Sequence, residues 1–224
     1  MRDRLGLYRD ITYIKWNNTY QAFNHTGEWT LRSSIPKRFI KVGSETYELP
    51  AHHLPPDPAI VYFLLNLSFH YSIRDLGAGV GQYGRYILYG NPNAKYLAFD
   101  GGEGLSHFTG NFVARTKLHI FQPYIPVMDW VVSLEVGEHI PFVFEKDYIL
   151  NLHAHNTKGI LLSWAQLGQF GHGHINNHSP SYIQRLFSLK GYTLDRDATW
   201  SIRRQALYPW FKHNIYVFRR SDMT

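Results

Sequence analysis

The segment Glu135-Val136-Gly137-Glu138-His139 brings two carboxylates and an imidazole close together in the sequence. Glu135, Glu138 and His139 stand at positions i, i+3 and i+4, a spacing that puts side chains on one face of a helical turn. The segment directly follows an expected strand. Carboxylates and an imidazole that converge at the carboxyl end of a strand can hold a hard divalent cation. This segment is therefore a candidate metal-binding or acid–base centre.

A glycine-rich turn follows an earlier expected strand, where residues 73–84 read I-R-D-L-G-A-G-V-G-Q-Y-G. Glycine permits positive φ angles and a close approach of the backbone to a ligand, and the N–H groups that open the next helix face that ligand. In one frame, Gly79, Gly81 and Gly84 have the spacing of a dinucleotide fingerprint, and Asp100 lies at the right distance to bind a ribose. In a second frame, an acid at the strand end precedes the first of three alternating glycines.

Strands and helices are expected to alternate from residue 57 onwards, with short connections. Such alternation favours a mostly parallel sheet covered by helices on both faces, so we predict a doubly wound α/β domain. Glu145 and Asp147 are expected on the solvated face of a helix. The expected strands are 72–76, 95–100, 118–121, 130–134, 159–163, 192–195 and 214–219, and the expected helices include 59–67, 141–153 and 180–190.

Residues 1–56 differ from the rest, because their apolar residues are sparse, mostly aromatic and without helical or strand periodicity. Residues 37–42 and 46–49, separated by Gly43-Ser44, predict a hairpin. We interpret 1–56 as an N-terminal extension that covers a main domain of residues 57–224.

Composition excludes several classes of protein. The 224 residues contain no cysteine, which excludes disulfides, thiolate zinc sites, iron–sulfur ligation and cysteine nucleophiles. No apolar run approaches the roughly 18 residues that span a bilayer, and the first residues do not resemble a secretory leader. We therefore expect a soluble, cytoplasmic protein without a membrane partner. The net charge of +6 permits a phosphate-bearing substrate but does not require one.

The second frame, Asp75-x-Gly77-x-Gly79-x-Gly81, resembles motif I of the class I S-adenosylmethionine (SAM)-dependent methyltransferases. The resemblance extends over residues 57–220: 96–100 is similar to the family's second strand, 129–135 to its motif IV, and 159–164 to its fifth strand. It implies a seven-stranded, mostly parallel sheet, SAM as methyl donor, and a ribose held by the acid after the second strand. The cofactor-binding residues that it implies are Asp75, Gly77, Gly79, Gly81, Asp100, Gly101, His119, Ser133 and Glu135.

One departure from this family concerns adenine. Members of the family often carry an acid after the third strand, which holds the adenine amino group. Residues 118–123 read L-H-I-F-Q-P and contain no acid. The resemblance therefore implies that His119 or backbone atoms take over this contact.

The Glu-x-x-Glu-His segment resembles an element of two groups of SAM-dependent O-methyltransferases. One group acts on ubiquinone precursors and the other on the 3′-terminal ribose of small RNAs. In the RNA group a further histidine completes a metal site, and His174 matches it by its spacing to the following helix. The resemblance thus implies an Mg²⁺ or Mn²⁺ site of Glu135, Glu138, His139 and His174. The alternative is that a carboxylate of this segment caps the next helix.

The expected reaction is an in-line transfer of the SAM methyl group, most simply to a hydroxyl of a small molecule, with Glu138, His139 and His174 as catalytic residues. RNA ribose is the alternative acceptor, and nitrogen acceptors remain open. Trp164, His172 and Trp210 are candidate substrate contacts, although both tryptophans also suit plain packing. A SAM-binding module without activity and a nicotinamide dehydrogenase are the competing hypotheses. The oligomeric state is not predicted.

Overall fold

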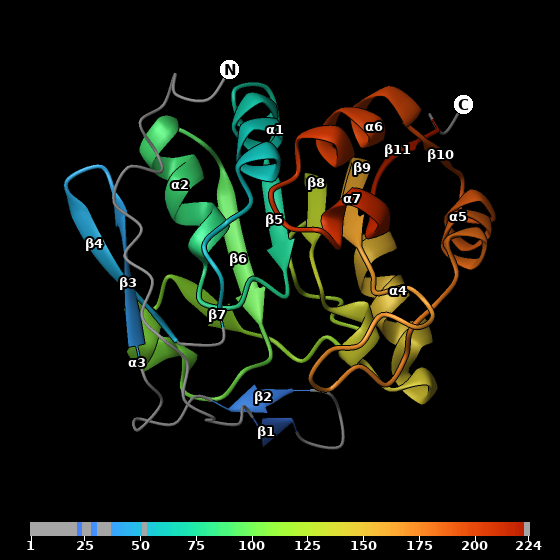
Figure 1. The fold of residues 1–224 in the computed structure, drawn as a ribbon, viewed down its shortest axis with the longest axis horizontal. Helices are drawn as coiled ribbons and strands as arrows, with labels where there is room; N and C mark the ends of the chain where they lie inside the picture. Colours follow the sequence, from blue (N-terminus) through green and yellow to red (C-terminus); the bar gives the residue numbers. More distant parts are fainter. Residues whose placement is uncertain (1–21, 24–27, 31–36, 51–52, 222–224) are drawn as a thin grey trace.

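A computed structural model describes residues 22–23, 28–30, 37–50 and 53–221, and a seven-stranded sheet forms its centre (Figure 1). The pairs β5–β6, β5–β8, β6–β7 and β8–β9 are parallel, whereas β11 runs antiparallel to its two neighbours. This confirms the predicted seven-stranded, mostly parallel sheet. Across the sheet the strands are β10 (Tyr192–Leu194), β11 (Ile215–Arg220), β9 (Asn156–Ser163), β8 (Met128–Ser133), β5 (Ile73–Leu76), β6 (Tyr96–Asp100) and β7 (Val113–Arg115).

Helices cover both faces of the sheet (Figure 1). Successive strand residues point to opposite faces, so Val132 joins one buried core and its neighbour Val131 the other. The first core contains side chains of α1 (Pro58–Ser68), α2 (Gln82–Gly90) and α6 (Arg196–Gln205), and the second those of α4 (Glu145–Ala154) and α5 (Pro180–Ser188). In the described part of the chain, no helix is long and apolar enough to cross a membrane.

Two of the helices start at a residue whose side chain caps them. Asp57 caps α1, since its Oδ1 accepts a hydrogen bond of 2.9 Å from the N–H of Ala59, and Ser179 caps α5. The other oxygen of Asp57 accepts from the N–H groups of Leu207 and Tyr208 at 2.7 and 3.0 Å. One carboxylate therefore both starts α1 and fixes the link between α6 and α7 (Phe211–Asn214), which is 150 residues away in sequence.

The third strand of the prediction is wrong. Residues 118–121 form a turn, and the strand that pairs with β6 is β7, residues Val113–Arg115. β7 lies at the edge of the sheet and buries only Val113, so it lacks the apolar pattern of a central strand. Leu118 and His119 are buried for another reason, because both line a cavity above the sheet.

The segment between β8 and α4 is less regular than the single helix expected over 141–153. It contains two short 3₁₀ turns, η1 (Gly137–His139) and η2 (Phe142–Phe144), and α4 begins only at Glu145. The remaining helix, α3 (Leu105–Thr109), lies between β6 and β7. The η1 turn is the one that carries Glu138 and His139, and it fixes their direction relative to the end of β8.

The described N-terminal residues form two small antiparallel pairs. β3 (Lys37–Val42) and β4 (Glu45–Pro50) make the predicted hairpin, and β1 (Ala22–Phe23) pairs with β2 (Trp29–Thr30). Ile40 and Leu49 are buried in the same core as α1 and α2. The division into an extension and a main domain at residue 56 stays a prediction, and most of residues 1–36 lie outside the described residues.

Candidate active site

A cavity of about 400 Å³ opens at the carboxyl ends of β5, β6 and β8. This is the edge at which open α/β sheets bind their ligands, where neighbouring strands lead to connections on opposite faces. Its lining residues come from the N-terminal part (Glu28, Trp29 and 53–55), from β5 and its loop (Asp75, 77–79, Gln82 and Tyr83), from the segments after β6 and β7 (100–101 and 118–119), from the segment after β8 (134–136, His139 and Ile140), and from two later segments (His172, His174, Tyr208, Trp210 and Phe211).

The glycine loop after β5 forms one wall of this cavity. Gly77 and Gly79 have φ angles of 89° and 59°, values that glycine adopts without strain. A Cβ atom on Gly77 would lie 2.2 Å from Val136, so the loop and the segment after β8 approach each other closely. Gly81 is the N-cap of α2 and packs against Phe112, behind the loop and not among the lining residues. Gly81 is predicted to bind the cofactor, but its position indicates structural support of the loop instead.

Asp100 ends β6 and is buried at the cavity. Its two oxygens accept hydrogen bonds of 2.8 Å from the backbone N–H groups of Gly79 and Gly102. Burial raises the pKa of Asp100 to about 6, and the nearby carboxylate of Glu28 adds to this rise. Gly101, the next residue, also lines the cavity. The acid predicted to bind a ribose thus stands directly beside the glycine loop.

Asp75 is the acid at the end of β5. Its Oδ2 accepts a hydrogen bond of 2.7 Å from the hydroxyl of Tyr96, and complete burial raises its pKa to about 7. It lines the cavity below Gly77. Two buried acids, Asp75 and Asp100, therefore flank the glycine loop on neighbouring strands.

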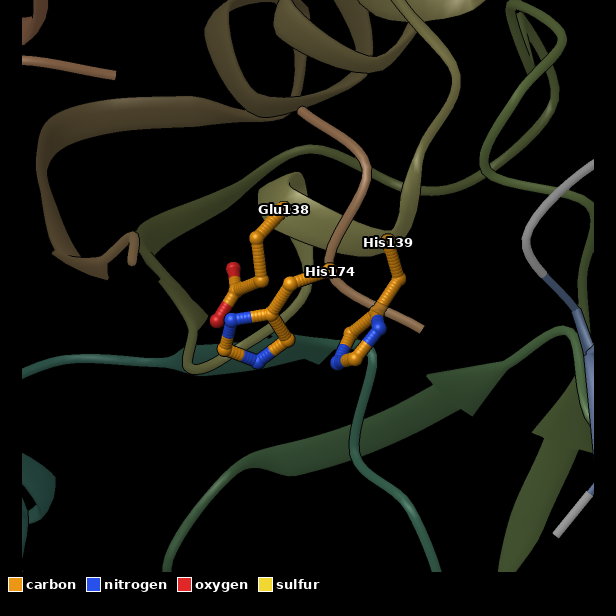
Figure 2. A group of neighbouring side chains, drawn as sticks. All are labelled: Glu138, His139 and His174. Carbon is orange, nitrogen blue, oxygen red and sulfur yellow. The ribbon is translucent and has the colours of Figure 1, made fainter. Parts of the chain in front are cut away.

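His139 and His174 line the cavity beyond the end of β8, and Glu138 lies beside them without lining it. Potential ligand atoms of Glu138, His139 and His174 all lie within 4.8 Å of one another, and Figure 2 shows the three side chains pointing the same way. Glu135 is not part of this group. Its φ of 55° is unusual for a residue other than glycine, and its Oε1 accepts hydrogen bonds from Ser163 Oγ and Asn214 Nδ2 at 2.8 Å each.

The electrostatics of this group favour ligand binding. Glu138 is fully buried, and among the described residues neither of its oxygens has a partner with good hydrogen-bond geometry. Burial raises the pKa of Glu138 well above its usual value, and the Glu135 carboxylate raises it further. Burial lowers the pKa of His139 to about 4 and also lowers that of His174. Both imidazoles are therefore neutral near pH 7.

The tautomers of the two histidines follow from their hydrogen bonds. Nδ1 of His139 lies 3.0 Å from the carbonyl of Gly173, and Nδ1 of His174 lies 3.2 Å from that of Gln169. A carbonyl can only accept, so each neutral ring carries its proton on Nδ1. The Nε2 atoms keep their electron pairs and can bind a metal ion or take up a proton. The alternative interpretation as a helix cap is not supported, because Phe144 occupies the N-cap of α4.

Comparison with solved structures identifies the fold. No family model and no curated protein matches the chain in sequence. Magnesium protoporphyrin IX methyltransferase from Synechocystis PCC 6803, solved with bound S-adenosylhomocysteine (SAH), superposes with a TM-score of 0.54 at 16% identity, over 72% of this chain and 82% of that one. The CcbJ methyltransferase from Streptomyces caelestis gives 0.56 at 9% identity, over 75% and 91%. The chain has a methyltransferase fold.

A third structure with this methyltransferase fold is NcsB1, an O-methyltransferase from neocarzinostatin biosynthesis, solved in complex with SAH and 1,4-dihydroxy-2-naphthoic acid. It has a TM-score of 0.51 at 11% identity, and the match covers 73% of this chain and 52% of NcsB1. Similarity at these levels of identity establishes the architecture of the chain.

Within this methyltransferase fold, the loop that carries His174 is tied firmly to η1. The N–H groups of Ile175 and Asn176 both donate to the carbonyl of Glu138, at 2.9 and 3.0 Å. The Glu145 carboxylate accepts from Asn176, His178 and Tyr182 at 2.8, 2.6 and 2.5 Å. We expected Glu145 on a solvated face, but it is buried because it collects these three donors.

The predicted substrate contacts divide into two groups. His172 and Trp210 line the cavity, and Trp210 stacks on Tyr208 with ring centroids 4.9 Å apart. Trp164 is not among the lining residues. Its indole is buried against Gly137 and donates a hydrogen bond of 2.7 Å to the carbonyl of Asn176, so it is a packing residue that supports the histidine loop.

Two further predicted cofactor residues have different surroundings. Ser133 is buried behind the cavity, where its hydroxyl donates to the carbonyl of Leu76 at 2.6 Å. It holds β8 to β5 and does not line the cavity. His119 does line the cavity, and its Nδ1 lies 3.5 Å from a carboxylate oxygen of Glu28. Sequence reasoning missed Glu28, Trp29 and His53, because their stretch carries no motif.

Proposed function

We propose that the protein is a SAM-dependent methyltransferase that transfers the methyl group to a hydroxyl of a small molecule. The observation that carries this proposal is the continuity of one cavity from Asp100 and the glycine loop to His139 and His174. A single elongated ligand in it reaches both a ribose-binding acid and a group able to accept a proton. The catalytic unit is then residues 57–224, with 1–56 as an extension that contributes to the cavity.

The methyl donor is held mainly by the β5 and β6 ends. The carboxylate of Asp100 binds the ribose hydroxyls, since a charged acceptor of this kind is a strong partner for two neighbouring O–H groups. Gly77 and Gly79 line the cavity and carry no side chain, so the backbone of the loop can approach the ligand closely. The carboxyl groups of Glu135 and Asp75 lie beside the methionine portion, whose positive sulfonium favours their charged forms.

Residues of the chain then align the acceptor oxygen with the methyl group and accept the proton of the hydroxyl. Methyl transfer is an in-line displacement, so the protein must hold the acceptor oxygen opposite the sulfur and keep water away. Tyr208, Trp210 and Phe211 give the acceptor side of the cavity apolar walls. His139 and His174, both neutral and with Nε2 unprotonated, are placed to accept the hydroxyl proton.

Glu138, His139 and His174 also fit a divalent cation. A buried carboxylate and two neutral imidazoles within 4.8 Å form a mixed oxygen and nitrogen donor set. Glu135, whose side chain interacts with that of Glu138, stays the predicted fourth ligand. Mg²⁺ or Mn²⁺ bound there would lower the pKa of an acceptor hydroxyl.

The metal proposal has its own test. Glu138→Gln and His174→Ala should each remove Mn²⁺ binding measured by calorimetry, together with any stimulation of turnover by divalent ions. His213→Ala, a histidine on α7 that does not line the cavity, is the control. Full activity in EDTA would contradict a catalytic metal and leave the two histidines as the proton acceptors.

A second acceptor class, RNA ribose, is favoured by the net charge of +6 and by the Glu-x-x-Glu-His resemblance. RNA binding depends steeply on salt, because neutralised phosphates release counterions. If RNA is the acceptor, turnover with RNA should fall several-fold between 50 and 200 mM salt. The protein should then show no turnover with small phenols or other hydroxyl compounds.

The activity itself is tested in two steps. SAH should raise the melting temperature, because a ligand that binds only the folded protein stabilises it, whereas NAD should not. Labelled SAM offered with small hydroxyl compounds, RNA and protein should then transfer its methyl group to the first class. If NAD raises the melting temperature and SAH does not, the dehydrogenase hypothesis is favoured. If SAH binds but no methyl group is transferred to any acceptor class, a binding module is favoured.

A further inference from the structure

We infer that Glu28, from the N-terminal segment, recognises the amino group of the adenine ring, so that this segment forms part of the donor site. The inference rests on the proposed function, since it assigns a residue to one part of SAM. It concerns a residue that no motif identifies and that precedes the glycine loop by about fifty positions in the sequence.

The segment around Glu28 is docked on the residues that follow Asp100. The N–H of Glu103 donates a hydrogen bond of 2.9 Å to the carbonyl of Trp29, and the indole of Trp29 covers Gly102, where an added Cβ would lie 2.8 Å from it. Figure 1 shows β1 and β2 at the end of the sheet towards which β5 and β6 point. Glu28 is thereby fixed next to the ribose-binding acid.

The carboxylate of Glu28 is buried and lines the cavity together with His119. Its Oε1 lies 3.5 Å from Nδ1 of His119, and its Cγ lies 3.0 Å from the position that a Cβ of Gly101 would take. It also contributes to the raised pKa of Asp100. Three different neighbours therefore place this carboxylate at the β6 end of the cavity.

The order of the strands tells which part of the ligand meets Glu28. The cavity runs along the sequence β7, β6, β5, β8 of neighbouring strand ends, with His119 after β7 and His139 after β8. A nucleoside whose sugar binds Asp100 and whose reactive end faces His139 must direct its base the other way. That direction leads to Glu28 and His119.

Adenine offers an exocyclic amino group, which donates two hydrogen bonds. A carboxylate accepts without donating, and is therefore the side chain best matched to such a group. Residues 116–127, which follow β7, contain no acid. Asp100 already stands at the sugar, so among the described lining residues Glu28 is the carboxylate that reaches the base.

The test compares SAH with S-inosylhomocysteine, in which an oxygen replaces the adenine amino group. A carboxylate that accepts from the amino group repels this oxygen. The intact chain should therefore prefer SAH by about tenfold or more in calorimetry, in line with hydrogen bonds to charged groups. Glu28→Gln, whose amide can donate to the oxygen, should weaken SAH binding and abolish the preference.

Two controls separate this inference from the proposed function. Glu103→Gln changes an exposed acid of the same region and should leave both affinities and the preference unchanged. Asp100→Asn should lower the affinities for SAH and S-inosylhomocysteine to the same extent and leave the preference for SAH unchanged. If Glu28→Gln lowers the affinities for SAH and S-inosylhomocysteine equally, or leaves the preference for SAH unchanged, the role of Glu28 is refuted. SAH binding by the intact chain would still support the proposed function. An intact chain that binds neither ligand would refute both.

Discussion

The N–H of Gly79 donates a hydrogen bond of 2.8 Å to Oδ2 of Asp100, and this bond joins the glycine loop of β5 to the acid of β6. The same carboxylate binds the N–H of Gly102 through its other oxygen. Asp100 is therefore oriented by the backbone on both sides before a ligand arrives. Such preorganisation lowers the entropy that binding must overcome.

Replacement of this acid gives the first prediction. Asp100→Ala removes the ribose acceptor and also leaves two backbone N–H groups without their partner, so SAH affinity should fall at least tenfold by calorimetry. Asp197→Ala, which removes an exposed acid at the start of α6, is the control and should bind SAH normally. Unchanged affinity in Asp100→Ala would remove this residue from the donor site.

The buried acids predict a pH dependence of stability in the ligand-free protein. Burial raises the pKa of Asp75 to about 7 in the folded chain, against 3.8 for an exposed aspartate. Between these values the folded state binds more protons than the unfolded state, so the free energy of unfolding falls as pH rises from about 4 to 7. Below the lower value the stabilisation is complete, and above the higher value it is lost.

Asp75→Asn isolates this effect, because the amide is neutral at every pH and still accepts a hydrogen bond from Tyr96. The melting temperature of Asp75→Asn relative to the unmodified protein should rise by several degrees between pH 4 and pH 8. Asp129→Asn is the comparison: hydrogen bonds from Ser72 lower the pKa of Asp129 below 3.8, so its titration lies below pH 4 and the difference in melting temperature for Asp129→Asn should stay nearly constant between pH 4 and pH 8. A constant difference for Asp75→Asn would show that this carboxyl titrates normally.

Gly77 and Gly168 offer a matched pair for the cost of a side chain in the loop. Their φ angles are 89° and 82°, but an added Cβ at Gly77 would lie 2.2 Å from Val136, whereas Gly168 has open space around it. Gly168→Ala should cost roughly 1–2 kcal/mol of unfolding free energy through its backbone conformation alone. Gly77→Ala should cost about 1–3 kcal/mol more, because of overpacking.

Urea unfolding of both variants measures this difference. Val136→Ala removes the methyl group that the new side chain would meet, so it should recover most of the additional loss when combined with Gly77→Ala. Equal costs at Gly77 and Gly168 would mean that the loop moves away from Val136 easily. The close approach of the two segments would then not define the width of the cavity.

The sequence predicts the sheet and the β5 side of the site well, because the evidence is local. The glycines at positions 77, 79 and 81 predict a turn with positive φ angles, and all three have positive φ angles in the structure. β7 was not predicted, because only Val113 of this edge strand is buried and the strand therefore has no apolar pattern in the sequence. The stretch 118–121 was mistaken for it, since residues buried at a cavity look the same in sequence as residues buried in a sheet.

Glu28 and Glu145 could not be recognised from the sequence, for a common physical reason. Each is buried only because polar partners come from distant positions: His119 for Glu28, and residues 176–182 for Glu145. An isolated acid in an aromatic stretch, or at the start of a helix, has the same sequence pattern when it is solvated. Tertiary contacts decide between the two.

Glu145 leads to the last prediction, which concerns the position of His174. Its carboxylate holds Asn176, His178 and Tyr182, and so fixes the loop that carries this histidine. Residues that orient metal ligands in this way typically change metal affinity by about 10- to 100-fold when they are replaced. Glu145→Ala should therefore weaken Mn²⁺ binding by about tenfold, while SAH affinity, which depends on the β5 and β6 ends, stays unchanged.

Tyr182→Phe removes one of the three donors and should give a smaller loss of Mn²⁺ affinity, whereas Lys146→Ala, next to Glu145 on the exposed side of α4, should give none. Calorimetry with Mn²⁺ and with SAH on the same preparations distinguishes a positioning role from a general loss of structure, because misfolding would reduce both affinities together. Mn²⁺ binding that is intact in Glu145→Ala and lost in His174→Ala would mean that the histidine loop keeps its position without this carboxylate, through its other hydrogen bonds, among them those of Ile175 and Asn176 to Glu138 and of Trp164 to Asn176.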